Sequence, residues 1–477
     1  MQTLSPVLNH LKSLSKDSFA YSISNIVTRA SSFILLPVYA RLFAPADIGV
    51  VNLINVTFFF ISSVMLFCLD SAAVVFYWKD GITSKAKIFS SWFWFVFLVN
   101  AILCLFVFCF SNSLSKLVLS DSGYGIHFTL TFVAGLFNIV PLIYSNFLRI
   151  TRHPFTQLKI ALLTALMNLF FTYLFLFYLK SGLIGIFYSQ LCAAFVNGVV
   201  CCWLFRKQLS IKLFDWPLLK QMLSFSIPVI PTTITFWLSN SISLYSISYF
   251  FDKHEVGLYN VASSIASIIN ILISAISQAV LPFALSINKE EQAKAIYSKI
   301  FQTYYLTLGF IGLLISVFSK EILSIIATNK YSESELVLIF LVFNSVLIGS
   351  NTIAGIGLNV AQKMKSLFKV SVICTLSNIA FVFILVPLIG KEGAAIAAMI
   401  SNIFLVVLTM RSSQKYYFVP YNYIVPAVSF LAYLSFSLLF YLGLNDFSVK
   451  VLLIKSVLCM AVLTTLFYHT KKTFSVA

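Results

Sequence analysis

Fourteen apolar runs, each about long enough to cross a bilayer, occupy most of this 477-residue chain. A hydrocarbon core of about 30 Å needs about 20 apolar residues in a helix. The runs are continuously apolar, so they predict helices and not the alternating strands of a membrane barrel. We therefore expect an all-α integral membrane protein with about 14 transmembrane helices. The predicted spans are 19–43, 47–78, 88–111, 124–148, 155–179, 182–205, 223–250, 256–284, 299–319, 335–360, 366–389, 393–411, 422–444 and 449–469.

Basic residues are distributed unevenly between the two sides of these spans. Most of the 32 Lys and Arg residues fall on the side that also holds both chain ends. Cytoplasmic loops carry the excess of basic residues, so both termini are predicted to be cytoplasmic. The net charge of +17 follows from this topology and favours contact with anionic membrane lipid. No basic patch with interleaved aromatic residues is present, so nucleic acid is not expected as a partner.

The chain contains an internal repeat. Residues 47–53, after the first span, match residues 255–261, after the seventh. Because six spans separate the copies, both have the same orientation, which is a parallel repeat. The repeat predicts two six-helix bundles followed by two additional C-terminal helices. The expected division is a bundle at 1–205, a cytoplasmic linker at 206–222, a second bundle at 223–411 and the two extra helices at 412–477.

Two short helices are predicted outside the spans. Asp215 can cap a helix over residues 215–222, with Pro217 in its first turn, where a missing N–H costs nothing. Asn288, with Glu291 three residues later, can cap another.

Arg29 lies in the middle of the first predicted span. A charge at the bilayer centre costs about 2.5–3.5 kcal/mol, so this guanidinium should face the bundle interior or a wet cavity. Asn25 and two serines share its helical face. One interpretation is a cation site for an anionic substrate group, because guanidinium binds phosphate in a bidentate manner. The other, compatible with the first, is an ion pair with Asp70 that joins the first two spans.

Two further ionisable residues lie inside predicted spans. Asp70 could be a protonatable group that couples transport to H+ or Na+, or a residue wetted from the cytoplasmic side. Lys455 is six residues into the last span and is expected to extend to the interface.

Hydroxyl and amide side chains form stripes on the seventh and eighth spans. Such stripes either join helices or line a polar cavity that could bind sugar hydroxyls. The candidate substrate-binding residues from these stripes are Ser239, Ser243 and Asn270. No metal-ligand spacing and no hydrolase or Walker motif occurs, so neither a metal, a cofactor nor a catalytic residue is expected. We predict a membrane transporter and not an enzyme.

Three stretches resemble a known family. Residues 33–49, FILLPVYARLFAPADIG, are similar to the opening signature of polysaccharide repeat-unit (O-antigen) flippases of the Wzx type, in the exporter superfamily that includes the multidrug MATE transporters. Residues 225–231 continuing to 255–259, and residues 377–397, resemble segments of the second half. One departure is that Ser243-Leu244 stands where family members often have Asp-Arg in the seventh span.

The resemblance implies a flippase in the bacterial inner membrane. Its substrate would be an undecaprenyl-diphosphate-linked oligosaccharide, moved from the cytoplasmic to the periplasmic leaflet for O-antigen or other surface polysaccharide assembly, driven by an ion gradient. The polysaccharide polymerase machinery is an implied partner. The alternatives are a multidrug or cation antiporter on the same fold, and a membrane-embedded glycan polymerase or ligase. The antiporter alternative is disfavoured because Asp70 is the one acidic residue away from the ends of the predicted spans. The polymerase or ligase alternative is disfavoured because the outer loops are short.

Overall fold

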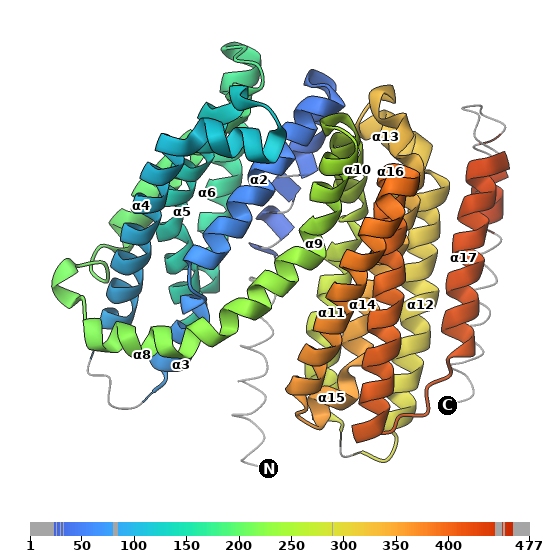
Figure 1. The fold of residues 1–477 in the computed structure, drawn as a ribbon. Coiled ribbons are helices and arrows are strands. Elements are labelled where there is room, and N and C mark those ends of the chain that lie inside the picture. Colours follow the sequence, from blue (N-terminus) through green and yellow to red (C-terminus); the bar gives the residue numbers. More distant parts are fainter. Residues whose placement is uncertain are drawn as a thin grey trace. The chain divides into compact units, whose positions relative to one another are not determined.

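The computed structural model describes residues 23–24, 26–28, 30–31, 33–79, 84–288, 290–443, 451 and 454–460. Within these ranges every regular element is a helix (Figure 1). Eleven of the described helices are long and apolar enough to cross a membrane. The prediction of an all-α, multi-pass membrane protein is confirmed.

The chain forms two compact units. Unit 1 comprises residues 1–35 and 50–237, and unit 2 comprises residues 36–49 and 238–477. The chain therefore passes between the units three times: at residues 35–36, at residues 49–50 inside α2 (Pro45–Met65), and at residues 237–238 inside α9 (Ile230–Phe250). The further division into six-helix bundles and two extra C-terminal helices stays a prediction.

Unit 1 is built around α5 (Gly125–Ile150), which packs against α4 (Ala86–Leu119) and α7 (Ile184–Phe205). Its other helices are α3 (Leu69–Tyr77), α6 (Pro154–Tyr173), which continues as one π-helical turn over Leu174–Tyr178, and α8 (Trp216–Ser226). Large aromatic side chains fill the interior, among them Phe89, Trp92 and Phe205, all fully buried.

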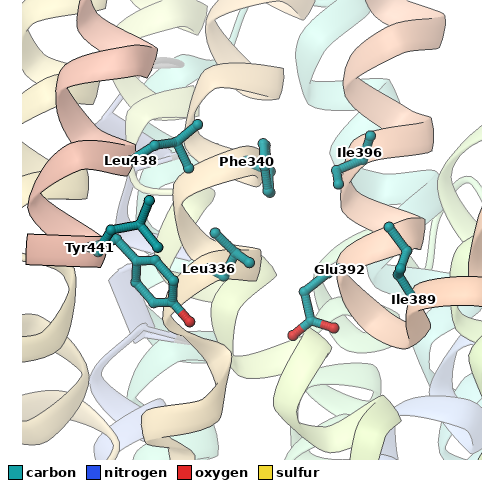
Figure 2. Close-up of a pocket in the computed structure, with 8 residues that line it drawn as sticks. Leu336, Phe340, Ile389, Glu392, Ile396, Leu438 and Tyr441 are labelled. Atoms are coloured by element: carbon teal, nitrogen blue, oxygen red, sulfur yellow. The ribbon is translucent and has the colours of Figure 1, made fainter.

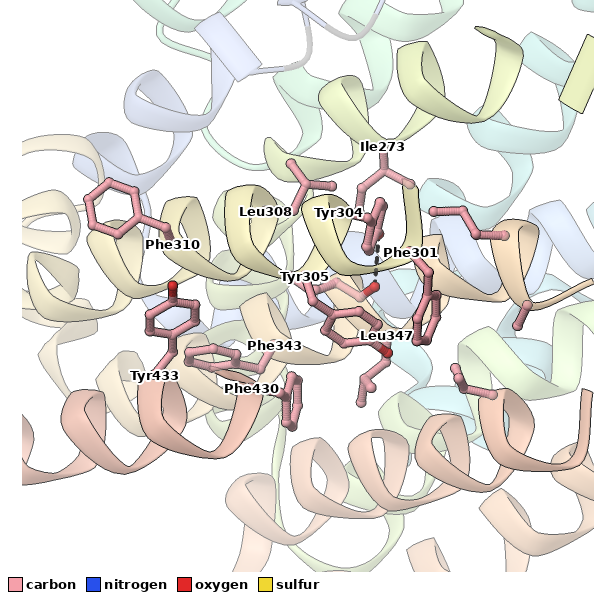
Figure 3. Close-up of a cluster of buried hydrophobic side chains, with 14 of the residues drawn as sticks. Ile273, Phe301, Tyr304, Tyr305, Leu308, Phe310, Phe343, Leu347, Phe430 and Tyr433 are labelled. Carbon is pink, nitrogen blue, oxygen red and sulfur yellow. Dashed lines mark hydrogen bonds between the residues drawn. The ribbon is translucent and has the colours of Figure 1, made fainter. Parts of the chain in front are cut away.

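Unit 2 contains the remaining helices. They are α10 (Lys253–Ala266), α11 (Ile269–Ser286), α12 (Ala293–Val317), α13 (Ser319–Ile326), α14 (Glu335–Ala354), α15 (Ile356–Val360), α16 (Met364–Tyr416) and α17 (Ile424–Gly443). Aromatic rings from α12, α14 and α17 pack together in its core (Figure 3). Buried tyrosines there keep hydrogen-bond partners: the Tyr304 hydroxyl donates to the Val346 carbonyl at 2.9 Å, and the Tyr305 hydroxyl donates to Ser350 Oγ at 2.9 Å.

Helix α16 is an antiparallel hairpin of two helices. Ser401 Oγ and Asn378 Oδ1 lie 3.5 Å apart, although 23 residues along one straight helix would separate them by about 35 Å. The chain reverses at Ile389 and Gly390, and Gly390 has a φ of 63° and a ψ of −140°. Glycine adopts this conformation without the steric cost that other residues carry. The two predicted spans 366–389 and 393–411 are the arms of this hairpin.

Two other predicted spans are interrupted. The span predicted at 47–78 breaks between α2 and α3, where Phe67 and Cys68 have left-handed φ values of 54° and 51°. The span predicted at 256–284 is divided between α10 and α11. The first predicted span is described with gaps, and most of the fourteenth lies outside the described residues, so the count of fourteen stays a prediction.

Repeat-related glycines meet where α2 and α10 begin, within unit 2. A Cβ atom added to Gly49 would lie 1.9 Å from the Lys253 carbonyl oxygen, and one added to Gly257 would lie 1.8 Å from the Pro45 oxygen. Each glycine thus provides the space that the other copy's backbone occupies. This crossing gives a physical reason for the sequence match between residues 47–53 and 255–261.

Candidate functional site

Two of the predicted substrate-binding residues belong to the first predicted span. Arg29 and Asn25 lie outside the described residues. The predicted Arg29–Asp70 pair and the predicted substrate contacts of Arg29 and Asn25 therefore stay predictions.

Asp70 occupies the first turn of α3, directly after the break at Phe67 and Cys68, and its side chain is exposed. The positive end of the helix dipole favours a carboxylate at this position. The break packs against the start of α9, with Cys68 Sγ 3.1 Å from Thr233 Oγ1. The sequence had predicted one continuous span at 47–78 with Asp70 inside it, whereas the carboxylate lies at a helix terminus.

Ser239 and Ser243 contribute to helix packing in unit 2. The Ser239 hydroxyl forms a hydrogen bond with Thr375 Oγ1, and the Ser239 carbonyl accepts from Asn378 Nδ2 at 3.1 Å. Ser243 is 4% exposed and forms a hydrogen bond with the Tyr259 hydroxyl. These contacts join α9 to α16 and α10, which is the helix-joining alternative. A substrate role for either hydroxyl would require these bonds to open.

Asn270 lies in the first turn of α11 and is half-buried. Further along α11, the Ser277 hydroxyl donates to Thr352 Oγ1 on α14 at 3.3 Å. The polar stripe was predicted on a single helix, the eighth span. Because α10 ends at Ala266, this stripe is shared between α10 and α11. Its α11 part retains a partly accessible amide at Asn270.

The structure also contains buried ion pairs that sequence reasoning missed. Lys455 is 2% exposed, and its ammonium lies 2.8 Å from Glu321 Oε1 and 3.2 Å from Oε2. The expectation that Lys455 extends to the interface is wrong, because a carboxylate from α13 compensates its charge inside the protein. The need for an acidic partner of Lys455 could have been predicted, since a lysine inside a membrane span is usually paired. The identity of a partner 134 residues away was not predictable from spacing.

Asp215, in the segment predicted as a linker at 206–222, is fixed by contacts within unit 1. Its Oδ1 accepts from the Leu218 N–H at 3.1 Å, which confirms the predicted cap of α8, and its Oδ2 lies 2.9 Å from Lys87 Nζ. The hydrogen bond from Lys87, followed by that from Leu218, lowers the pKa of the Asp215 carboxyl below its usual value. Ser91 Oγ accepts from the Asp215 N–H at 2.8 Å. The second predicted cap, at Asn288, is wrong: α12 begins at Ala293 without a side-chain cap.

The fold is that of a class of multi-helix membrane transporters. The lipid II flippase MurJ, in an inward closed conformation, matches with a TM-score of 0.74 and 16% identity over 95% of this chain and 99% of MurJ. An inward-facing multidrug MATE transporter matches with a TM-score of 0.61 and 16% identity over 82% of this chain and 94% of that one. A Vibrio cholerae MATE transporter gives a TM-score of 0.60 and 15% identity, with 85% and 96% covered.

The family described as polysaccharide biosynthesis protein matches residues 38–335. The chain belongs to this family, as the sequence resemblance had indicated. The capsular polysaccharide biosynthesis protein CapF of Staphylococcus aureus is 25% identical over 215 residues, which cover 44% of this chain and 54% of CapF. The chain thus spans about half the length of this relative.

Proposed function

We propose that the protein is a flippase that moves an undecaprenyl-diphosphate-linked oligosaccharide from the cytoplasmic to the periplasmic leaflet of a bacterial inner membrane. The product would be used for O-antigen or other surface polysaccharide assembly. One observation carries this proposal: a polysaccharide biosynthesis family match over residues 38–335 coincides with a fold shared with the lipid II flippase over 95% of the chain.

Arg29 and Asn25 are proposed to bind the diphosphate of the substrate. A guanidinium stays charged at all physiological pH values and offers paired N–H donors to phosphate oxygens. Asn270 is proposed to bind sugar hydroxyls, together with Ser239 and Ser243 if their packing bonds open during transport. The lipid tail would stay in the bilayer, because its transfer into a polar cavity would expose apolar surface to water.

Replacement of Arg29 tests the diphosphate site. Arg29→Ala and Arg29→Lys would be expressed in a host that lacks its own flippase, and surface polysaccharide and accumulated lipid-linked oligosaccharide measured. The Ala variant should lose at least tenfold in export, because hydrogen bonds to a charged group contribute about 1.5–3 kcal/mol. Lys116→Ala, at an exposed lysine of α4, is the matched control. Full export by Arg29→Ala at normal protein level would remove Arg29 from the mechanism.

Asp70 is proposed to couple translocation to an H+ or Na+ gradient. Its exposure at the start of α3 supports this role, because a coupling carboxylate must exchange ions with water. Asp70→Asn should slow gradient-driven translocation in proteoliposomes while leaving protein level unchanged. Glu333→Gln, an exposed carboxylate of the segment Asn329–Ser334, is the control. Equal gradient-driven rates for Asp70→Asn and the parent protein would exclude the coupling role.

The proposed topology places both termini in the cytoplasm, where glycosyltransferases build the substrate, and delivers the product to the polymerase machinery on the other side. Reporter fusions at each terminus test this orientation. Because MATE transporters share the fold, drug susceptibility of cells with and without the protein tests the antiporter alternative.

A further inference from the structure

A groove on unit 2 lies among α14, the second arm of α16 and α17, with a volume of about 470 Å³ (Figure 2). This volume is within the range of small-molecule sites, about 300–1,000 Å³. Six apolar side chains line it: Leu336, Phe340, Ile389, Ile396, Leu438 and Leu442. Each is partly exposed, so the groove opens at the protein surface.

The two polar side chains of the groove lie at one end. Figure 2 shows the Glu392 carboxylate and the Tyr441 hydroxyl together there, while Phe340, Leu438 and Ile396 lie further along. The groove thus has one polar end and an apolar body. A molecule with one polar head and a hydrocarbon chain has the same division.

The groove lies where its helices end. Helix α14 begins at Glu335, α17 ends at Gly443, and the α16 hairpin reverses at Gly390. In a chain that crosses a membrane, these ends define the depth of lipid headgroups. Neighbouring side chains that face outward are apolar and highly exposed, such as Leu388 at 72% and Leu439 at 65%. A bilayer lipid therefore has direct access, with its head at the polar end and a chain along the groove.

The charges at the polar end favour a cationic head. Glu392 is accompanied by one buried lysine, Lys391, whose ammonium lies 2.8 Å from Glu255 Oε2 and 3.5 Å from Glu392 Oε1. His254 Nδ1 lies 3.9 Å from Glu255 Oε1, on the side of Glu255 and not of Glu392. Two carboxylates therefore share one ammonium, and the closer carboxylate is Glu255. Glu392 keeps acceptor capacity for an external N–H donor and would repel an anionic head that carries no cationic group, such as a diphosphate.

We propose that this groove binds a phospholipid with a primary amine head group, of the phosphatidylethanolamine type, whose ammonium donates to Glu392. The site is separate from the proposed flippase substrate, which carries a diphosphate. Lipid binding and translocation are measured independently, so either proposal can fail without the other.

The test uses the full chain, purified in mild detergent, and native mass spectrometry in competition between phosphatidylethanolamine and phosphatidylcholine with identical acyl chains. The two lipids differ in that choline has no N–H donor. The parent protein should retain phosphatidylethanolamine about fivefold to tenfold better, as expected for one partly exposed charge-assisted hydrogen bond. Glu392→Gln should abolish this preference, whereas Glu333→Gln should keep it.

Two variants that fill the groove test its location. Ile396→Trp and Leu336→Trp should each reduce the tightly retained lipid, whereas Leu439→Trp, on the exposed face of α17 outside the groove, should not. Unfolding temperatures measured in detergent without added lipid identify any variant that has lost its fold. If one filling variant has lost its fold, the other is used to test the location of the groove. The proposal is overturned if Glu392→Gln keeps the preference, if the filling variants bind like Leu439→Trp, or if phosphatidylglycerol or undecaprenyl phosphate displaces the amine lipid.

Discussion

Replacing Lys455 with Met should destabilise the protein strongly. The side chains of Lys455 and Glu321 are 3% and 10% exposed, and both carboxylate oxygens lie within 3.2 Å of the ammonium. Removal of one partner leaves the other charge buried without compensation, which costs about 3–5 kcal/mol. Solvent screening reduces this value little, because both groups are almost fully buried.

The double variant distinguishes an ion-pair effect from a packing effect. Replacement of both members of a buried pair by apolar residues is often neutral. Lys455→Met combined with Glu321→Leu should therefore be more stable than Lys455→Met alone. Lys330→Met, at an exposed lysine, should change the free energy of unfolding by less than about 0.5 kcal/mol.

Equilibrium unfolding in mixed detergent micelles, followed by circular dichroism, measures these differences. Two results would refute the reasoning. One is a loss below about 1 kcal/mol for Lys455→Met, which would show that the ammonium reaches water. The other is strict additivity in the double variant, which would show that the two charges do not interact.

Two further predictions follow from close contacts. Gly257→Ala places a methyl group 1.8 Å from the Pro45 oxygen and should lower the free energy of unfolding by about 1–3 kcal/mol, whereas Gly443→Ala, with no atom within 4 Å of its Cβ, should be neutral; equal stability of the two variants would contradict the crossing. The pKa of Asp215 is lowered in the folded protein, so its contribution to linker stability is fully present above its usual value of 3.8 and is lost as the pH falls through the lower folded value. The hydrogen-exchange rates of residues 209–215, corrected for intrinsic rates, should increase over that acidic range in the parent protein but not in Asp215→Asn. Equal pH dependence in both proteins would show that the Lys87–Asp215 contact does not cause the increase.

Much of the fold could be predicted from the sequence because the bilayer restricts the choice. A continuous apolar run long enough to span it has one stable state, the helix. The reversal at Gly390 and the cap at Asp215 were also predictable, because both depend on local backbone chemistry. The break at Phe67 and Cys68 was not, because the residues around it are as apolar as the rest of that run.

The candidate site was less predictable for a different reason. Whether Ser239 joins helices or lines a cavity depends on what faces it, and the answer, Thr375 on α16, is set by tertiary packing. The same holds for Lys455, whose partner comes from a distant part of the chain. Residue type identified these positions as unusual, whereas their contacts required the folded structure.

The meeting of Gly49 and Gly257 links the evolution of the two halves. A side chain gained at either position would collide with main-chain atoms of the other repeat copy, so a substitution at one glycine requires a backbone change at the other. Hybrids that join one half of this protein to the other half of a relative should therefore tolerate the exchange only where both contributors keep glycine at this junction.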